Sequence, residues 1–191
     1  MPAAPKRATY EDLVRLPENL VGEILDGELF ASPRPASPHA FAASVIGSDL
    51  LGGFQRPPGD PSGLGGWWVL HEPELHFVAD VLVPDLAAWR SERMPRVPDA
   101  PFFTLAPDWV CEVISPSTAR IDRSRKMAIY AREGVEDLWI VDPLAQTVES
   151  YRLDVGRWVL LRTVAGTGEE RIAPFEALPL TLGRWWITSQ P

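Results

Sequence analysis

A single cysteine, Cys111, is present among the 191 residues of the chain, so no internal disulfide can form. A chain without disulfides suits a reducing compartment, and we expect a cytoplasmic protein. Because Cys111 is flanked by Val110 and Val113, we predict that its thiol lies in the core and is not a nucleophile. Histidine is also scarce. His71 and His76 have no nearby cysteine and no second histidine at helical spacing, so a zinc site is not indicated.

Long apolar runs are missing as well. No stretch approaches the roughly 20 apolar residues that a membrane-spanning helix needs. The first residues, MPAAPKRATYEDL, lack the apolar segment of a secretion signal. We therefore expect no association with a membrane.

Basic residues are outnumbered: 18 Lys and Arg stand against 26 Asp and Glu, which gives a formal net charge of -8. This sign excludes nucleic-acid binding through bulk electrostatics, because such binding depends on cations that neutralise phosphates. Any contact with nucleic acid must use a local basic surface. Residues 120–132 offer a candidate, with four arginines and Lys126 against Asp122 alone. A solvated helix face explains the same pattern equally well.

The order of predicted elements indicates one α+β or mixed α/β domain over residues 1–191, with more strands than helices. Asp26-Gly27 between alternating apolar residues predicts a two-residue hairpin turn. Ser37-Pro38 predicts the cap and first turn of a long helix. A strand, a helix and a second strand after residue 109 suggest a crossover unit. The predicted elements are a short helix between Thr9 and Pro17, the hairpin around 26–27, a helix from 37 to Gly52-Gly53, a turn-rich loop at 55–66, two or three strands within 67–90, an irregular stretch at 91–107, a strand at 109–114, a helix at 121–132, a strand at 137–141, a meander at 147–164 and a last strand near 178–182.

Three acidic residues, Glu23, Asp85 and Glu112, lie inside or at the end of apolar strands instead of in turns. Leaving such a carboxylate ionised and unpaired would cost on the order of several kcal/mol, so a cationic group should lie nearby. If the three converge on one sheet edge, their oxygens would bind a hard divalent cation, with Mg²⁺ or Mn²⁺ the expected occupant. An ion of this kind activates water and screens the charge of a phosphate.

Lys126 is the cation that the sequence offers. In the predicted helix it projects between Ile129 and Tyr130, so it borders the inward face. The short link SPSTA folds this helix back near the strand that carries Glu112. Two interpretations remain open. In the first, Lys126 reaches the Glu112 region, where it would orient a water and stabilise negative charge on phosphoryl oxygens. Alternatively, it forms a surface pair with Asp122, worth about 0.3 to 0.5 kcal/mol.

Several segments that carry chemistry occur in a characteristic order: Glu23, Pro84-Asp85, EVISPST from Glu112, Lys126 within DRSRKMAIYAREGV, and LWIVDP from Leu138. This order resembles the Uma family of restriction-type endonucleases, within the PD-(D/E)XK nuclease superfamily. The likeness runs from about Glu23 to Val148. It is specific because several unrelated segments recur in the same order.

The resemblance implies a restriction-endonuclease-like fold, in which helices flank a mixed β-sheet between an N-terminal β-hairpin and a C-terminal β-meander. It also implies a Mg²⁺-dependent DNA endonuclease whose metal site contains Asp85 and Glu112, with Glu23 as a further acidic ligand or water holder. The superfamily usually has its lysine two residues after the glutamate, where this chain has Ile114. In the Uma type the lysine lies on the following helix, and Lys126 matches that position.

His39 and Tyr130 are further candidates. The family tends to have a histidine where His39 begins the long helix, and there it would donate to a phosphate or hold a water. A surface cap residue is the alternative. Tyr130 either braces the site or fills the core. Ser115 and Ser117 lack a histidine partner in their sequence context, so a serine nucleophile is not indicated.

Two classes of function follow from these observations. The first is hydrolysis of DNA by a homodimer or higher homo-oligomer, since by analogy with the superfamily two active sites are needed to cut both strands of a duplex. The second is a catalytically inactive or conditionally active module that keeps the nuclease fold and joins a larger assembly. The net charge of -8 favours such a module, and so does the hydrophobic fraction of 46%, which leaves apolar area for self-association.

Overall fold

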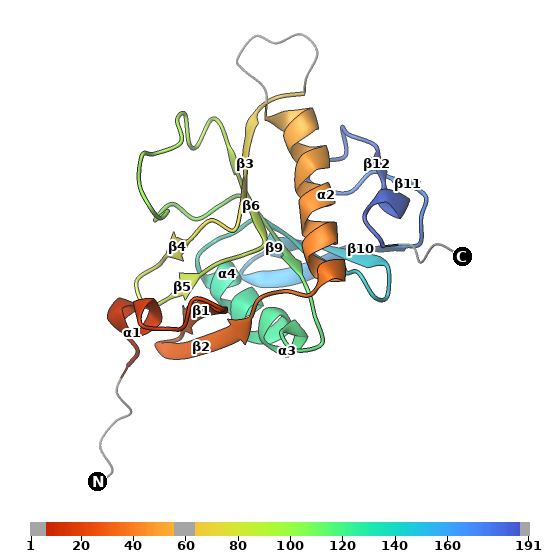
Figure 1. Ribbon diagram of the computed structural model, residues 1–191. Helices are drawn as coiled ribbons and strands as arrows, with labels where there is room; N and C mark the ends of the chain where they lie inside the picture. The colour runs from red at the N-terminus through yellow and green to blue at the C-terminus, as the bar shows by residue number, and fades with distance from the viewer. Residues whose placement is uncertain (1–6, 56–63, 188–191) are drawn as a thin grey trace.

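The computed structural model describes residues 7–55 and 64–187, so most of the loop predicted at 55–66 lies outside the described residues. Within these ranges the strands form a six-stranded, a four-stranded and a two-stranded sheet. The helix α2 (Ser37–Phe54) crosses one face of the largest sheet, and the C-terminal segments lie beside it (Figure 1). The mixed α+β class that the sequence predicts is confirmed.

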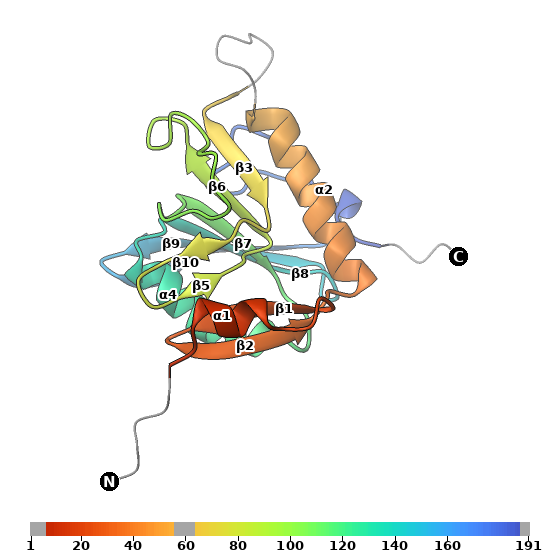
Figure 2. The same ribbon diagram turned by 60° about the vertical axis from the view of Figure 1, so that its left-hand side comes forward.

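The four-stranded sheet contains the predicted hairpin and has the strand order β2-β1-β5-β4. Asp26 and Gly27 both have positive φ, 54° and 80°, as the expected tight turn requires. Figure 2 shows the hairpin at the base of the molecule, with α1 against it. The elements of this part are α1 (Tyr10–Val14), β1 (Leu20–Leu25), β2 (Glu28–Pro33), β4 (Leu75–His76) and β5 (Val81–Leu82).

The six-stranded sheet has the order β10-β9-β8-β7-β6-β3. Strands β7 and β8 pair in parallel through the predicted crossover, whereas the other neighbours are antiparallel. The meander predicted at 147–164 is the antiparallel pair β9-β10, which continues the sheet from β8. Residues 67–90 form four short strands that belong to two sheets, not two or three strands. The bounds are β3 (Trp67–His71), β6 (Leu86–Arg90), β7 (Trp109–Val113), β8 (Asp137–Asp142), β9 (Thr147–Asp154) and β10 (Arg157–Ala165).

Both faces of the six-stranded sheet are covered, which explains why β7 is buried throughout and apolar except at Glu112. Trp109, Cys111 and Val113 pack with residues of α2, whereas Val110 packs with the helix that follows β7. Cys111 is completely buried, as predicted. Because side chains alternate along a strand, Glu112 faces the same side as Val110, toward the following helix.

The helix after β7 begins two residues before the predicted start and contains a π-helical turn. It consists of α3 (Ala119–Ile121), the π turn η1 (Asp122–Lys126) and α4 (Met127–Arg132). The helix ends before Gly134, whose φ of 78° fits a glycine just past the helix end. The strand predicted near 178–182 is shorter in the structure, where β12 (Leu180–Thr181) pairs with β11 (Glu169–Glu170). A 3₁₀ turn, η2 (Leu182–Arg184), follows β12 directly.

The long helix α2 begins at Ser37, the residue that was predicted to be its N-cap. Ala36 is its N-cap and provides no side-chain hydrogen bond, so the prediction of Ser37 as the cap is wrong. Pro38 lies in the first turn, where its missing N–H costs nothing. No helix within the described residues is long and apolar enough to cross a membrane.

The turn between β9 and β10 contains a strained residue. Val155 has a φ of 45° and is 94% exposed, although β-branched side chains disfavour the left-handed region. Replacing Val155 by Asn is expected to raise the free energy of unfolding by about 1 kcal/mol, because Asn tolerates this conformation beside Gly156. Urea denaturation measures the change. Val155→Thr keeps the β-branch and should give no gain, and equal stabilities of the two variants would refute the strain.

Candidate active site

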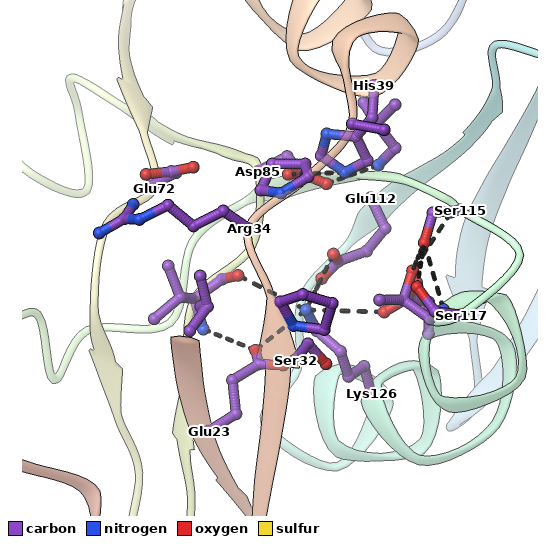
Figure 3. Close-up of a pocket in the computed structure, with 18 of the residues that line it drawn as sticks. Glu23, Ser32, Arg34, His39, Glu72, Asp85, Glu112, Ser115, Ser117 and Lys126 are labelled. Atoms are coloured by element: carbon purple, nitrogen blue, oxygen red, sulfur yellow. Dashed lines mark hydrogen bonds and ion pairs between the residues drawn. The ribbon is translucent and has the colours of Figure 1, made fainter. Parts of the chain in front are cut away.

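A hollow of about 330 Å³ lies between the hairpin and the six-stranded sheet. Its walls include Glu23 of β1, Asp85 before β6, Glu112 of β7 and Lys126 of η1, together with His39 of α2 (Figure 3). The structure therefore brings the four main predicted residues together. The three carboxylates converge on this hollow from two sheets and not on one sheet edge, because Glu23 belongs to the four-stranded sheet and Glu112 to the six-stranded sheet.

Lys126 and Glu112 form the centre of the site. The ammonium Nζ of Lys126 lies 2.8 Å from Oε1 and 2.9 Å from Oε2 of Glu112. The hydroxyl of Tyr130 donates to Oε1 of Glu112 at 2.5 Å, so Tyr130 both fills the core and braces the site. Lys126 and Glu112 are only 3% and 2% exposed. Of the two open interpretations of Lys126, the one that directs it to Glu112 is confirmed.

Glu23 approaches the same ammonium from the hairpin. Its Oε1 lies 3.0 Å from Nζ of Lys126 and also accepts the backbone N–H of Val83 at 2.8 Å. Val83 lies in the link between β5 and β6, two residues before Asp85. Glu23 therefore joins the hairpin, this link and the helix in one polar cluster.

Asp85 and His39 form a second contact on the opposite wall of the hollow. Oδ2 of Asp85 accepts the backbone N–H of Val113 at 2.7 Å, and Oδ1 lies 3.2 Å from Nε2 of His39. His39 is only 9% exposed, which excludes the alternative of a surface cap residue. Burial acts to lower the pKa of His39, but the hydrogen bond to Asp85 and the negative charges of Asp85, Asp122 and Glu72 together outweigh it and raise the pKa. Because a carboxylate oxygen accepts, Nε2 is the donor in this contact.

The ionisable groups of the cluster perturb one another. Burial raises the pKa of Glu112 well above its ordinary value, and neighbouring carboxylates add to this effect while Lys126 opposes it. Burial acts to lower the pKa of Lys126, but the surrounding groups, Glu112 and Glu23 foremost with Tyr130 and Asp122, together outweigh it and raise the pKa. The ammonium is therefore charged. Burial also raises the pKa of Tyr130, so its hydroxyl keeps the proton that it donates to Glu112.

Two residues of the hollow were missed by the sequence predictions. Asp122 was considered only as a surface partner of Lys126, yet it is 5% exposed, lines the hollow and lies 3.8 Å from Nζ. Its spacing of four residues from Lys126 was the available signal. Glu72 also lines the hollow, with a φ of 44°, and its N–H donates to the carbonyl of Asp85 at 3.1 Å. No sequence signal identifies it.

The charge of the hollow fits a bound cation. Five carboxylates line it, against the two permanent cations Lys126 and Arg34, and oxygen ligands suit a hard divalent ion. Yet within residues 7–55 and 64–187 no three acidic, histidine or cysteine side chains are already grouped as metal ligands. Both oxygens of Glu112 already accept hydrogen bonds, from Lys126 and Tyr130. The donor chemistry fits, because Oε2 accepts from Lys126 and keeps a lone pair that could ligate a cation.

The predicted basic surface at 120–132 is largely neutralised. Three of its arginines form ion pairs with acidic residues of other elements, and Lys126 is buried. The helix therefore presents little free positive charge, in agreement with the interpretation of a solvated face. The pairs are Arg123 with Glu149 at 2.6 Å, Arg125 with Glu28 at 2.8 Å and Arg132 with Asp26 at 3.1 Å.

Replacing Lys126 by Met tests the buried pair. At pH 8 the variant is expected to lose about 3 to 5 kcal/mol of unfolding free energy, because Glu112 is left buried without its partner. Since the pKa of Glu112 is raised, the folded variant takes up a proton as the pH falls, and the loss should shrink at pH 5. Chemical denaturation at both pH values measures this difference.

The matched control is the double variant Lys126→Met with Glu112→Gln, which removes both charges. It should recover much of the lost stability and show a weaker pH dependence. A loss that is equal at both pH values and persists in the double variant would contradict a buried ion pair at this position.

Comparisons with known proteins agree with this architecture. A crystal structure from Anabaena variabilis, described as that of "a putative nuclease belonging to DUF820", has a TM-score of 0.71 to this chain. The two sequences are 22% identical, and the match covers 94% of this chain and 97% of the other. At this identity the likeness establishes the fold alone. No curated protein matches the chain.

The family comparison extends over nearly the whole described structure. Residues 8–184 match the Uma2 family, which carries the description "Putative restriction endonuclease". The matched range includes the hairpin, both larger sheets and every residue of the hollow described above. The resemblance seen in the order of motifs is thereby confirmed, and the chain belongs to the Uma2 family.

Proposed function

We propose that the chain is a metal-dependent nuclease of the PD-(D/E)XK type, which hydrolyses phosphodiester bonds in DNA. The proposal rests on the buried contact between Lys126 and Glu112 in a hollow that Asp85 and Glu23 also line. Strongly perturbed pKa values of groups that line a hollow are typical of functional sites. Membership of a family described as restriction endonucleases supports the same reading.

Asp85 and Glu112 are the residues that would hold Mg²⁺ or Mn²⁺, with Glu23 as a further ligand or water holder. When bound, such an ion supplies Lewis-acid stabilisation of the phosphate and lowers the pKa of water. The excess of carboxylates in the hollow supports this choice, because an added divalent cation would offset it.

The residues of the chain would contribute charge and orientation. In hydrolysis the oxygen of a water bonds to phosphorus and one phosphorus–oxygen ester bond breaks. The ammonium of Lys126 donates to the phosphoryl oxygens as negative charge develops on them, and Glu23 keeps that ammonium in place. Tyr130 holds the carboxylate of Glu112 from the core side. The low exposure of these groups strengthens each electrostatic contact.

Cleavage of plasmid DNA tests the proposal. The chain is expected to nick plasmid with Mg²⁺ or Mn²⁺, and EDTA should abolish the reaction. Asp85→Ala and Glu112→Gln should each lower the rate by on the order of 100-fold or more, the scale seen when one electrostatic group is removed from an active site. Glu92→Gln is the matched control. Asp85 lies just before β6, whereas Glu92 lies just after β6, at the other end of the strand, and is exposed.

A catalytically inactive or conditionally active binding module is the second candidate. The hydrogen bonds of Glu112 favour this candidate, because its two oxygens already bind Lys126 and Tyr130 in place of a metal ion. Calorimetric titration with Mn²⁺ separates the two functions. A chain that neither binds Mn²⁺ nor nicks DNA at any salt concentration would be such a module, and nicking by Asp85→Ala at the parent rate would also refute the enzyme.

We further infer that the nuclease acts as a homodimer, because two active sites are needed to cut both strands of a duplex symmetrically. Light scattering is expected to give about twice the chain mass of 21.2 kDa. A measured mass near that of a single chain would contradict the dimer.

A further inference from the structure

We propose that His39 is a positioning residue, which orients the carboxylate of Asp85 through Nε2 and so sets the affinity of the site for a divalent cation. The inference rests on the proposed function and adds a role to it. It differs from the contact with a phosphate or water that the sequence suggested for His39.

The carboxylate of Asp85 is held from two separate elements. Val113 of β7 donates its backbone N–H to Oδ2 at 2.7 Å, and His39 of α2 donates from Nε2 to Oδ1 at 3.2 Å (Figure 3). A single hydrogen bond leaves a carboxylate free to rotate about its last torsion. Two bonds to its two oxygens fix the plane and therefore the direction of the remaining lone pairs.

The two nitrogens of His39 have different surroundings. Nε2 bonds to Asp85, whereas Nδ1 is buried and has no hydrogen-bond partner among the described residues. An imidazole that serves to contact a phosphate needs a free and accessible N–H. The nitrogen of His39 that reaches a polar group is already committed to Asp85, so the geometry favours positioning over a direct contact with substrate.

The helix that carries His39 is closely packed, which makes the position of the imidazole well defined. At Gly47 of α2, an added Cβ would lie 2.1 Å from the imidazole of His71 in β3. The absence of a side chain therefore lets α2 approach β3 closely. A group on a rigid element that hydrogen-bonds a metal ligand typically changes metal affinity by about 10- to 100-fold when it is removed.

Two amide substitutions distinguish the nitrogens. The side-chain nitrogen of Gln can occupy the place of Nε2, whereas that of Asn corresponds to Nδ1 and falls short of Asp85. In calorimetric titrations with Mn²⁺, His39→Asn and His39→Ala are expected to bind about 10- to 100-fold more weakly than the parent. His39→Gln should stay within about 3-fold of the parent, well short of that loss. Thermal unfolding without metal is measured for each variant.

The outcomes separate this inference from the proposed function. If the parent binds Mn²⁺ and His39→Asn binds it equally well, the positioning role is wrong and the metal site stands. If His39→Gln loses as much Mn²⁺ affinity as His39→Ala, and the loss in each variant follows its loss of thermal stability, His39 acts through packing alone. A variant with unchanged Mn²⁺ affinity but a raised KM for DNA would indicate contact with substrate instead. If the parent binds no Mn²⁺, the proposed metal site and this inference fail together.

Discussion

The buried contact between the ammonium of Lys126 and the carboxylate of Glu112 is the interaction on which the site depends. Neither charge is tolerable alone at an exposure of 3% or less, because each would lose its hydration without compensation. Their pairing explains why an apolar strand carries an acid and why the next helix turns a lysine inward. Glu23 reaches the same ammonium from another sheet. One positive charge thus connects β7 and the helix after it to the hairpin, which is distant in sequence.

The parts of the site that could be predicted are those in which a residue breaks the pattern of its own element. Glu112 interrupts an apolar strand, and Lys126 borders the apolar face of a helix, so each signals an unusual environment. The hairpin could also be predicted from the sequence, because the conformations required at Asp26-Gly27 are a local property of those two residues. The order of motifs then supplied the family.

The remaining features depend on pairings between distant segments, which local patterns do not encode. Periodicity identified short strands within 67–90 but did not distribute them between two sheets, because that choice depends on the strands they pair with. The π turn that carries Asp122 has no compositional signature. The bond between His39 and Asp85 requires knowledge of how α2 lies against the sheet. Sequence reasoning therefore found the charged groups but not all of their partners.

The turn at the tip of the hairpin contacts the C-terminal end of the helix that carries Lys126. Arg132 in the last turn of α4 pairs with Asp26 of the hairpin turn at 3.1 Å and with the buried Asp80, which also accepts the N–H of Asp26 at 2.5 Å. Together with the ion pairs of Lys126 with Glu23 and of Arg125 with Glu28, this attaches the hairpin to the helix at three points. We therefore expect hairpin and helix to open as one cooperative unit, so that their amide protons exchange with solvent together and not by fraying of the hairpin alone.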